Sequence, residues 1–284
     1  MPKFSIIIPA FNRAKVLPRA IQSILNQTNK DWELIVVDDG STDDTSNVIS
    51  AYFGLLGFRS VYQENYGVSG ARNLGATKSQ GEWLIFLDSD DELIKDALEN
   101  FSSFIDRFPG DQLFVAGNER RSFNETIIRI PKEGSYNPFL SGTFCIKKAF
   151  FDQIGGYDPL FTFSENTELL HRIMQASARP HLMPHVSLVY HENASGGSRN
   201  PENIINSVSL FLKKHQNSMS AHHKYLYNQI VGVNNLRVQR FGQAREYLWK
   251  AYLYKPWKIQ TLARFGLSFL PILSKIIYTK KIGI

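Results

Sequence analysis

Four carboxylates crowd the end of an apolar segment in the first hundred residues. The run from Trp83 to Leu87 is apolar enough to form a buried strand, and Asp88, Asp90, Asp91 and Glu92 follow it directly. Negative charges this close repel one another unless something positive lies among them. Because carboxylate oxygens suit Mg²⁺ and Mn²⁺, the cluster predicts a divalent cation site, with a solvated acidic turn as the alternative.

Polar and turn-forming residues follow three further apolar segments where each segment ends. They are Pro9, Phe11 and Asn12 after the first, Asp38 and Asp39 after the second, and Asn65 and Gly67 after the third. A helix cap at Ser41 or Asp43 would explain the residues after the aspartate pair, but not the pair itself. The glycine-containing turn could precede a helix N-terminus that suits a phosphate, although such a turn alone is weak evidence.

These segments belong to a regular alternation of strand and helix patterns. Strands are predicted at residues 4–10, 32–40, 58–65 and 82–91, and helices at 16–27, 41–53 and 69–80. The short connections imply right-handed crossovers and an α/β fold with a mostly parallel sheet covered by helices. Ligands of open α/β sheets bind beyond the carboxyl ends of the strands, so the polar residues are expected to line one crevice.

The length and composition of the chain limit its domain organisation. A chain of 284 residues with 43% hydrophobic residues can bury a full core, as one large domain or one domain with an appendage. The single cysteine, Cys145, cannot form an internal disulfide and is expected to be a small core residue. The opening MPKFSIIIPAFNR enters a short apolar run without a charged leader, so no secretion signal is expected.

The charge is distributed unevenly along the chain. Residues 200–284 hold 13 Lys and Arg against two Glu, a net charge of +11, whereas residues 1–199 carry −5. The sequence therefore predicts two electrostatic regions rather than one uniformly basic protein.

Four segments occur in a specific order: SIIIPAFNR, VVDDGSTDDT, NYGVSGARNLGA and FLDSDD. Together they resemble the nucleotide-sugar-binding half of family 2 glycosyltransferases, which have the GT-A fold. The resemblance covers residues 4–100 and continues through GTFCIKKAFFDQIGGYDPLF and SENTELLHRI to about residue 192. It implies a GT-A domain over 1–199, with a donor half at 1–100 and an acceptor half at 101–199, followed by a basic helical extension over 200–284.

The resemblance also implies roles on the donor side. Asp39 and Phe11 would hold the uracil or other base, and Phe11 keeps the stacking face of the tyrosine that is frequent there while losing its hydroxyl. Asp88 and Asp90 would form the D-x-D pair that reaches the ribose and a Mn²⁺ or Mg²⁺ ion. The implied donor-binding positions also include Pro9, Asn12, Asp38, Gly70, Arg72 and Ser89.

The general base is where this chain departs from the family pattern. The family places a Glu-Asp pair at the start of a helix, with the Asp as base, and the matching residues here are Glu165 and Asn166. An amide cannot accept a proton at neutral pH. Either Glu165 or Glu168, three residues apart on one helical turn, serves as the catalytic base, or the chain binds donor with little transfer. Acidic residues in a first turn would also favour the helix dipole without any catalytic role.

His191 is the histidine singled out by its position. It follows the strand-like run HVSLVYH and precedes a Gly- and Ser-rich loop, residues 195–198, of the kind that can close over a diphosphate. In related enzymes a histidine in this region can complete the metal sphere, so the resemblance implies His191 as a third ligand. An ordinary surface histidine is the alternative.

The last segment, residues 263–284, mixes bulky apolar residues with Arg264, Lys275, Lys280 and Lys281. Its longest uncharged stretch, 265–274, is far shorter than the ~20 residues that a spanning helix needs. An interfacial amphipathic helix on anionic lipid is predicted, and packing on the catalytic domain or a dimer contact is the alternative.

The resemblance to family 2 implies a metal-dependent inverting glycosyltransferase. It would move a sugar from a UDP-sugar to a hydroxyl of a glycan or lipid-linked acceptor in cell-surface polysaccharide synthesis. A non-catalytic nucleotide-sugar-binding module is one alternative. A nucleotidyltransferase is another, but PAFNRAKVLP is not the Gly- and Lys/Arg-rich loop typical of that class. No nucleic-acid partner is expected, an oligomer is possible, and the expected location is cytoplasmic, peripheral on the inner face of the plasma membrane.

Overall fold

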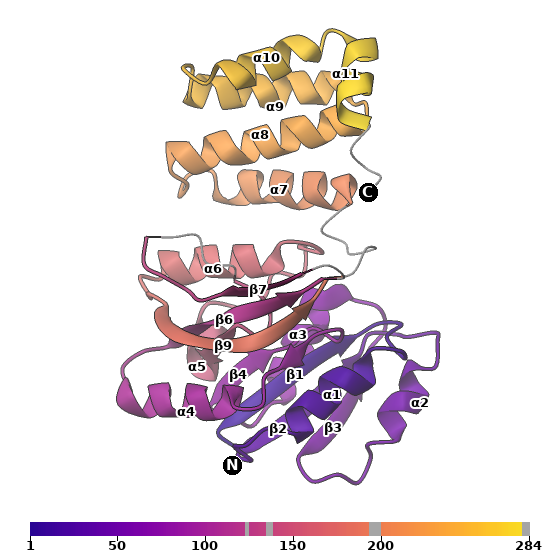
Figure 1. Cartoon of the computed structure of the whole chain (residues 1–284), viewed down its shortest axis with the longest axis vertical. Helices are drawn as coiled ribbons and strands as arrows, with labels where there is room; N and C mark the ends of the chain where they lie inside the picture. The colour runs from indigo at the N-terminus through magenta and orange to yellow at the C-terminus, as the bar shows by residue number, and fades with distance from the viewer. Residues whose placement is uncertain (123–124, 135–138, 193–199, 280–284) are drawn as a thin grey trace. The chain divides into compact units, whose positions relative to one another are not determined.

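The computed structural model describes residues 1–122, 125–134, 139–192 and 200–279 (Figure 1). Its contacts divide the chain into two compact units. The sheet unit comprises Met1–Leu160 and Glu165–Ala194, and the helical unit comprises Phe161–Ser164 and Ser195–Ile284.

Parallel strands form the N-terminal part of the sheet unit, in the order β3-β2-β1-β4. Their bounds are β1 Phe4–Ala10, β2 Trp32–Asp38, β3 Phe58–Tyr62 and β4 Trp83–Phe86. The helices that connect them are α1 Leu17–Leu25, α2 Thr45–Ser50 and α3 Gly67–Lys78. This arrangement confirms the predicted alternation and the parallel sheet.

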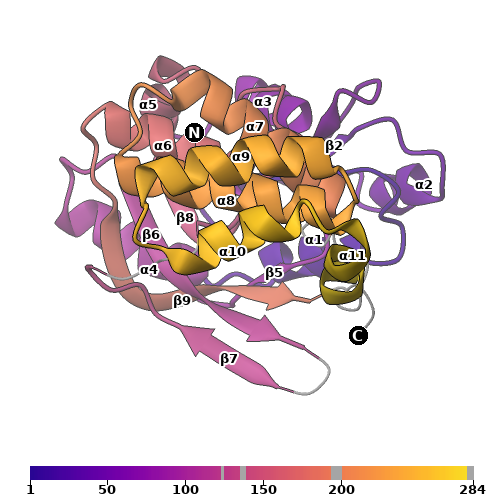
Figure 2. The ribbon, with the colours of Figure 1, turned by 90° about the horizontal axis from the view of Figure 1, so that it is seen from above.

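The rest of the sheet has mixed strand directions. β8 (Phe144–Lys147) runs antiparallel to β4 and to β6 (Leu113–Arg121), and β9 (His181–His191) runs parallel to β6. The short strands β5 (Glu92–Leu93) and β7 (Thr126–Arg129) pair with β9 and β6, and Figure 2 shows β7 alongside β6. The helices of this part are α4 Ala97–Arg107, α5 Lys148–Gln153 and α6 Glu165–Gln175.

Among the element boundaries that differ from the expectation, two matter for the site. β4 ends at Phe86, so the acidic residues form a turn instead of the last residues of a strand. α2 begins at Thr45, four residues later than expected, because Asp43 Oδ1 accepts the Thr45 N–H at 2.9 Å and holds the preceding residues in a loop.

Apolar layers cover both faces of the sheet. One buried cluster joins β1 and β2 to α1 and α4, and the other joins them to α3, α5 and α6. Gly75 lets α3 approach closely, since a Cβ there would lie 2.4 Å from Ile7 Cγ2. Cys145 on β8 is fully buried, which confirms the expected core position, and burial raises the pKa of its thiol well above the usual value.

The helical unit consists of a stack of helices. They are α7 Pro201–His215, α8 Ala221–Arg237, α9 Phe241–Tyr254, α10 Ile259–Leu267 and α11 Pro271–Thr279. α7 begins where Asn200 Oδ1 accepts the Glu202 N–H at 2.9 Å, with proline at the first helical position. Gly232 lets α8 pack closely on α9, because a Cβ there would lie 2.6 Å from Leu248 Cγ. These helices confirm the predicted C-terminal helical extension.

In the described part of the chain, no individual helix combines the length and apolar composition needed to cross a bilayer. The pair α10 and α11 meets that requirement only when taken together, and the chain bends by 117° between them.

Candidate active site

The parallel register brings two acidic strand ends to the same edge of the sheet. β1 lies between β2 and β4. The Asp39 N–H donates to the Ala10 carbonyl of β1 at 2.8 Å. The Leu87 N–H donates to the Ile7 carbonyl of the same strand at 2.9 Å. Asp39 and Asp88 therefore follow the carboxyl ends of the two strands that flank β1, which is where open α/β sheets bind ligands.

Asp39 is buried, and the turn after β3 fixes its carboxylate. Its Oδ1 accepts hydrogen bonds from Gln63 Nε2 at 2.6 Å and from the Tyr66 N–H at 2.9 Å. Gly70 supports this turn, because a Cβ at residue 70 would press to within 3.0 Å of Tyr66 Cβ. The carboxylate is thus held in place at the sheet edge, as recognition of a ligand N–H requires.

Asp38 and Asn12 stabilise the loops around this edge. Asp38 accepts the Ser41 N–H at 2.9 Å and the Ser46 hydroxyl at 2.8 Å. Asn12 Oδ1 accepts the Thr42 N–H at 2.8 Å, and its own N–H donates to Ser41 Oγ at 3.0 Å. Asn12 has φ +55°, a left-handed conformation that asparagine tolerates better than most residues. Asn12 thus ties the loop after β1 to the loop after β2, and Asp38 holds the loop after β2 to the end of its own strand.

Three other expected donor residues differ in accessibility. Phe11 is 40% exposed just beyond β1, so its ring is available for stacking on a flat group. Pro9 is buried inside β1, opposite Val37 of β2, and Ser89 is buried in the acidic turn. Of these three, Phe11 is the one that solvent reaches readily.

The acidic turn concentrates negative charge around a buried carboxyl. The Asp91 N–H donates to the Asp88 carbonyl at 3.1 Å, and Asp91 is only 2% exposed. Burial raises the pKa of Asp91 to about 9, and the charges of Asp88 and Asp90 contribute in the same direction. A cation near these carboxylates would relieve this repulsion.

The donor set of the turn fits a hard divalent cation that also binds phosphate. Asp88, with a side chain 39% exposed, and the partly exposed Asp90 supply carboxylate oxygens. Within the described ranges, no three or more His, Cys, Asp or Glu side chains are grouped to hold a metal by themselves. Mg²⁺ commonly takes one or two protein carboxylates and completes its coordination with phosphate and water. The residues therefore suit a metal shared with a diphosphate.

His191 lies next to the acidic turn with a carboxylate partner of its own. Its Nε2 is 2.7 Å from Glu92 Oε1, and its main-chain N–H donates to Asp91 Oδ1 at 2.8 Å. To join Asp88 and Asp90 around a metal through Nε2, the imidazole would have to leave Glu92. The loop expected to close over a diphosphate, residues 195–198, lies outside the described residues.

Arg72 of α3 connects the acidic turn to the start of α6. Its Nη2 donates to Asp88 Oδ1 at 2.6 Å and to Ser141 Oγ at 2.8 Å. Its Nη1 donates to Glu165 Oε1 at 2.7 Å, and the Tyr157 ring centre lies 5.1 Å from the guanidinium carbon. Although burial opposes the charge, these neighbours raise the pKa of Arg72 above its already high value. One buried cation thus joins residues from both halves of the sheet unit.

Asn166, where the sequence resemblance placed the expected base, belongs to a neutral network. Its Oδ1 accepts the Tyr157 hydroxyl at 2.7 Å, and its Nδ2 donates to Ser141 Oγ at 3.3 Å. Burial raises the pKa of Tyr157, so this hydroxyl stays protonated and donates. An aspartate at this position could accept from Tyr157 but could not donate to Ser141.

Glu168 is buried in an ion pair, whereas a general base was expected to face the acceptor. It is buried, and its two oxygens accept from Arg172 Nε at 2.8 Å and Nη2 at 2.7 Å. Arg172 also donates to the carbonyls of Ile154 and Gly156, each at 2.6 Å. This ion pair anchors α6 to the turn after α5. Of the two carboxylates expected as base, Glu165 is the one tied to the sheet edge.

Comparison with known families agrees with this geometry. The family described as "Glycosyl transferase family 2" matches residues 5–163, more than half of the chain. The chain belongs to glycosyl transferase family 2. The family match includes the donor-side residues and Arg72, whereas Glu165, Asn166, Glu168 and His191 lie beyond it. Membership in this family also favours a glycosyltransferase over the nucleotidyltransferase alternative.

Curated members of the family match part of the chain. It is 44% identical over 108 residues to the poly(ribitol-phosphate) beta-N-acetylglucosaminyltransferase TarP of Staphylococcus aureus, covering 37% of this chain and 33% of TarP. It is 37% identical over 153 residues to the GalNAc(5)-diNAcBac-PP-undecaprenol beta-1,3-glucosyltransferase of Campylobacter jejuni, covering 50% of this chain and 43% of that protein. The matched part spans less than half the length of each relative.

Solved structures extend the likeness to almost the whole chain. The crystal structure of S. aureus TarS 1-349 in complex with UDP-GlcNAc has a TM-score of 0.68 at 18% identity, covering 99% of this chain and 90% of TarS 1-349. A second crystal structure of TarS 1-349 has a TM-score of 0.65 at 19% identity. At such low identity the likeness concerns the fold alone, and it confirms the GT-A fold expected from the motifs.

Two residues of this candidate site were not singled out from the sequence. Tyr157 lies in GGYDPLF, where an isolated tyrosine gives no sign that it contacts an arginine of α3. Ser141 lies in a loop 69 residues from Arg72, and no pattern predicts that the two would meet. Both contacts depend on tertiary structure that local periodicity does not encode.

Proposed function

We propose that this chain is a metal-dependent inverting glycosyltransferase that uses a UDP-sugar as donor. The observation that carries the proposal is the bridge from Asp88 through Arg72 to Glu165, because it links the donor edge of the sheet to the carboxylate best placed as base. Membership in glycosyl transferase family 2 supports the reaction class. The UDP-GlcNAc complex of TarS supports a UDP-sugar as donor, and the name of TarP supports transfer of a sugar to a polymer.

On the donor side, residues at the sheet edge would bind the nucleotide. The fixed carboxylate of Asp39 would accept an N–H of the uracil, and the exposed ring of Phe11 would stack on the base. Asp88 would reach the ribose. A Mg²⁺ or Mn²⁺ ion held by Asp88 and Asp90 would stabilise the negative charge that develops on the departing diphosphate. For His191 to be an additional ligand through Nε2, its imidazole would have to give up the contact with Glu92 and bind the metal instead.

On the acceptor side, Glu165 would act as the general base. The acceptor oxygen attacks the anomeric carbon, the bond to the diphosphate breaks with its electron pair, and the hydroxyl proton passes to Glu165. A single displacement of this kind inverts the anomeric configuration. Arg72 fixes Glu165 through Oε1, and the hydrogen bonds of Asn166 hold the start of α6 in place.

The acceptor is proposed to be a hydroxyl of a glycan or lipid-linked glycan in cell-surface polysaccharide synthesis. The names of the C. jejuni and S. aureus relatives support this class. A cytoplasmic location with peripheral contact at the inner face of the plasma membrane belongs to the same proposal. The competing function is a nucleotide-sugar-binding module without transfer, suggested by the asparagine at residue 166.

Calorimetric titration with UDP, in Mn²⁺ and in EDTA, tests the donor site. We expect Mn²⁺ to strengthen binding to the natural chain and Asp90→Asn to remove most of that gain, while the two proteins bind alike in EDTA. Asp96→Asn, an equal charge change at an exposed position beyond β5, is the matched control. Equal Mn²⁺ dependence in Asp90→Asn would refute the D-x-D assignment. Donor turnover with a suitable acceptor then separates an enzyme from a binding module.

A further inference from the structure

The outward faces of α10 and α11 are apolar. Six aliphatic side chains on these helices are between 43% and 82% exposed: Ile259, Leu262, Ile272, Leu273, Ile276 and Ile277. The fully buried residues of the same segment are small and polar, namely Thr261, Ser268 and Ser274, while Phe265 and Tyr278 pack partly buried on the Leu248 cluster. Thr261 accepts a hydrogen bond from Gln229 Nε2 of α8 at 3.0 Å. A surface helix in water normally exposes polar residues, so the six exposed aliphatic side chains form an unusually apolar outer face.

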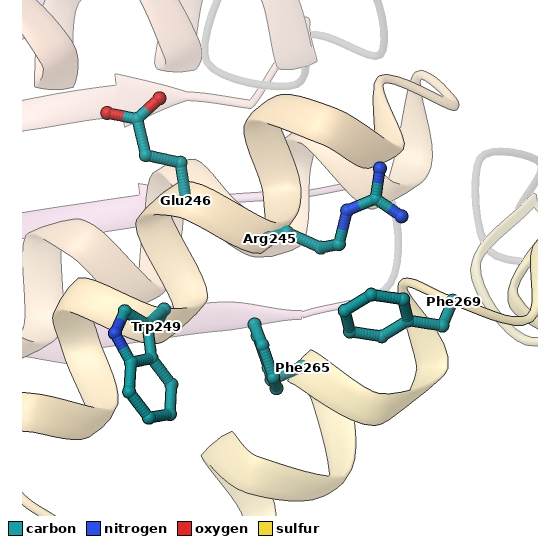
Figure 3. A pocket seen from close by; sticks show the side chains of 5 residues that line it. All are labelled: Arg245, Glu246, Trp249, Phe265 and Phe269. Atoms are coloured by element: carbon teal, nitrogen blue, oxygen red, sulfur yellow. The ribbon is translucent and has the colours of Figure 1, made fainter.

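An aromatic pocket lies beside this face, between α9 and the end of α10 (Figure 3). It has a volume of about 550 Å³, and the ring of Phe265 lies 5.4 Å from Trp249 and 5.2 Å from Phe269. The Arg245 guanidinium lies 4.8 Å from the Phe269 ring centre, and Glu246 points away from the rings. Trp249 is 44% exposed and Phe269 54% exposed. Aromatic rings next to an arginine are typical of side chains at the level of lipid headgroups.

Positive charge predominates in the segment that carries the apolar side chains. Residues 200–279 contain 11 Lys and Arg, and three of them are within two positions of an exposed aliphatic residue in the sequence: Lys258, Arg264 and Lys275. The two acidic residues of this stretch are both engaged, Glu202 with Arg240 at 2.8 Å and Glu246 with Lys250 at 2.6 Å. The charge of residues 200–279 is therefore net positive, with 11 Lys and Arg against two Glu.

We propose that the outward face of α10 and α11, with the Trp249 pocket at its edge, docks on an anionic lipid bilayer. A bilayer surface offers apolar interior to the aliphatic residues and negative headgroups to the basic residues. A second copy of the chain would bring like charges together across the contact, and its two acidic residues are already paired within the helical unit. Charge complementarity thus favours lipid over self-association. The inference deepens the proposed function and rests on it only for the lipid-linked nature of the acceptor.

Sedimentation of the full chain with vesicles tests the proposal. We expect binding to phosphatidylcholine vesicles that contain phosphatidylglycerol, weaker binding at high salt, and little binding to phosphatidylcholine alone. The double change Ile272→Ser and Ile276→Ser should weaken binding by about tenfold, because two exposed aliphatic side chains no longer enter the lipid. Ile128→Ser on β7, where the isoleucine is 62% exposed in the sheet unit, is the matched control and should bind as the natural chain does.

Trp257 provides a second readout, because it is 68% exposed in the turn between α9 and α10. The tryptophan fluorescence should shift to shorter wavelength on anionic vesicles, and Trp257→Phe should reduce that shift, leaving the part that comes from the 44% exposed Trp249 of the pocket.

Failure of the natural chain to bind anionic vesicles, or equal binding by the double variant, would overturn the proposal. A change in oligomeric state in the double variant without a change in vesicle binding would assign the face to self-association instead. UDP affinity, measured on the same samples, reports separately on the donor site, so failure of one proposal is distinguished from failure of the other.

Discussion

Nη1 of Arg72 lies 2.7 Å from Oε1 of Glu165, and this ion pair joins residues 93 positions apart in the sequence. The same guanidinium also holds Asp88. A change at either carboxylate therefore alters the charge balance of the other, and the donor side and the base are electrostatically coupled through a single side chain.

Replacement of Arg72 tests this coupling. Arg72→Met should lower the free energy of unfolding by about 3 kcal/mol, because it leaves two carboxylates without their buried partner. Transfer activity should be lost as well, and Arg72→Lys should restore stability only partly, since an ammonium lacks the planar fork. Urea unfolding with Arg129→Met, an exposed arginine on β7, as control provides the measurement. A stable Arg72→Met variant would show that the network is dispensable for folding.

Substitutions of the two glutamates of α6 are expected to have different effects, one on catalysis and the other on stability. Glu165→Gln should reduce kcat by roughly 10² to 10⁴ with little change in UDP affinity, because the amide can still accept from Arg72 but cannot take a proton. Glu168→Gln should mainly lower thermal stability, because it breaks the buried pair with Arg172. Steady-state kinetics and melting curves on both variants decide the matter. Full activity in Glu165→Gln would remove it as the base.

The adjacent aspartates after β2 should also behave differently. Asp39→Asn should weaken UDP binding by about tenfold or more, because an amide presents a donor as well as an acceptor to the base. Asp38→Asn should instead lower stability, since Asp38 holds Ser41 and Ser46. Calorimetry and melting curves are measured on both variants, so that each is the control for the other. Weaker UDP binding in Asp38→Asn and lower stability in Asp39→Asn would exchange the roles assigned to the two aspartates.

Glu33 gives the protein a predictable dependence on pH. Burial alone would raise the pKa of Glu33, but hydrogen bonds from Ser5, Gln80 and Arg59 outweigh it and lower the pKa below 4.5. A lowered folded-state pKa stabilises the protein above the unfolded-state value, and this stability is lost as the pH falls through the folded-state value. Glu33→Gln should therefore be less stable than the natural chain at pH ~7, with a gap that narrows below pH ~4.5 in urea titrations. The exposed Glu99→Gln should show no such convergence, and a gap independent of pH would contradict the assignment.

Gly75 sets the distance between α3 and the sheet, and α3 carries Arg72. Gly75→Ala should lower the free energy of unfolding by about 2 kcal/mol, because its methyl group would collide with Ile7. UDP affinity should fall with it if the helix shifts. Gly110→Ala is the control, since a Cβ there meets nothing within 4 Å. Unchanged stability in Gly75→Ala would show that the sheet relaxes around the added carbon.

The elements that follow simple periodicity were predictable from the sequence. β1, β2 and β4 are the near-continuous apolar runs that burial in a parallel sheet requires, and α1 shows an apolar face, whereas the edge strand β3 is only partly buried. The end of β4 was not predictable, because a strand and a turn can share the same apolar run. The hydrogen bond from the His191 N–H to Asp91 was not predictable either, because it comes from a strand that is distant in the sequence. The partnership of Glu168 with Arg172 satisfies the i, i+4 spacing, yet only burial makes it an anchor rather than a surface pair.

Cys145 has a practical consequence for experiments on this protein. It is the single thiol of the chain, it is fully buried on β8, and its pKa is raised, so little reactive thiolate forms near neutral pH. Towards maleimide reagents the folded chain should behave almost as if it contained no cysteine. One cysteine introduced at an exposed position such as residue 257 would then carry a fluorophore or spin label alone, without removal of the native thiol. Slow labelling of the unaltered protein would additionally report how often β8 opens to solvent.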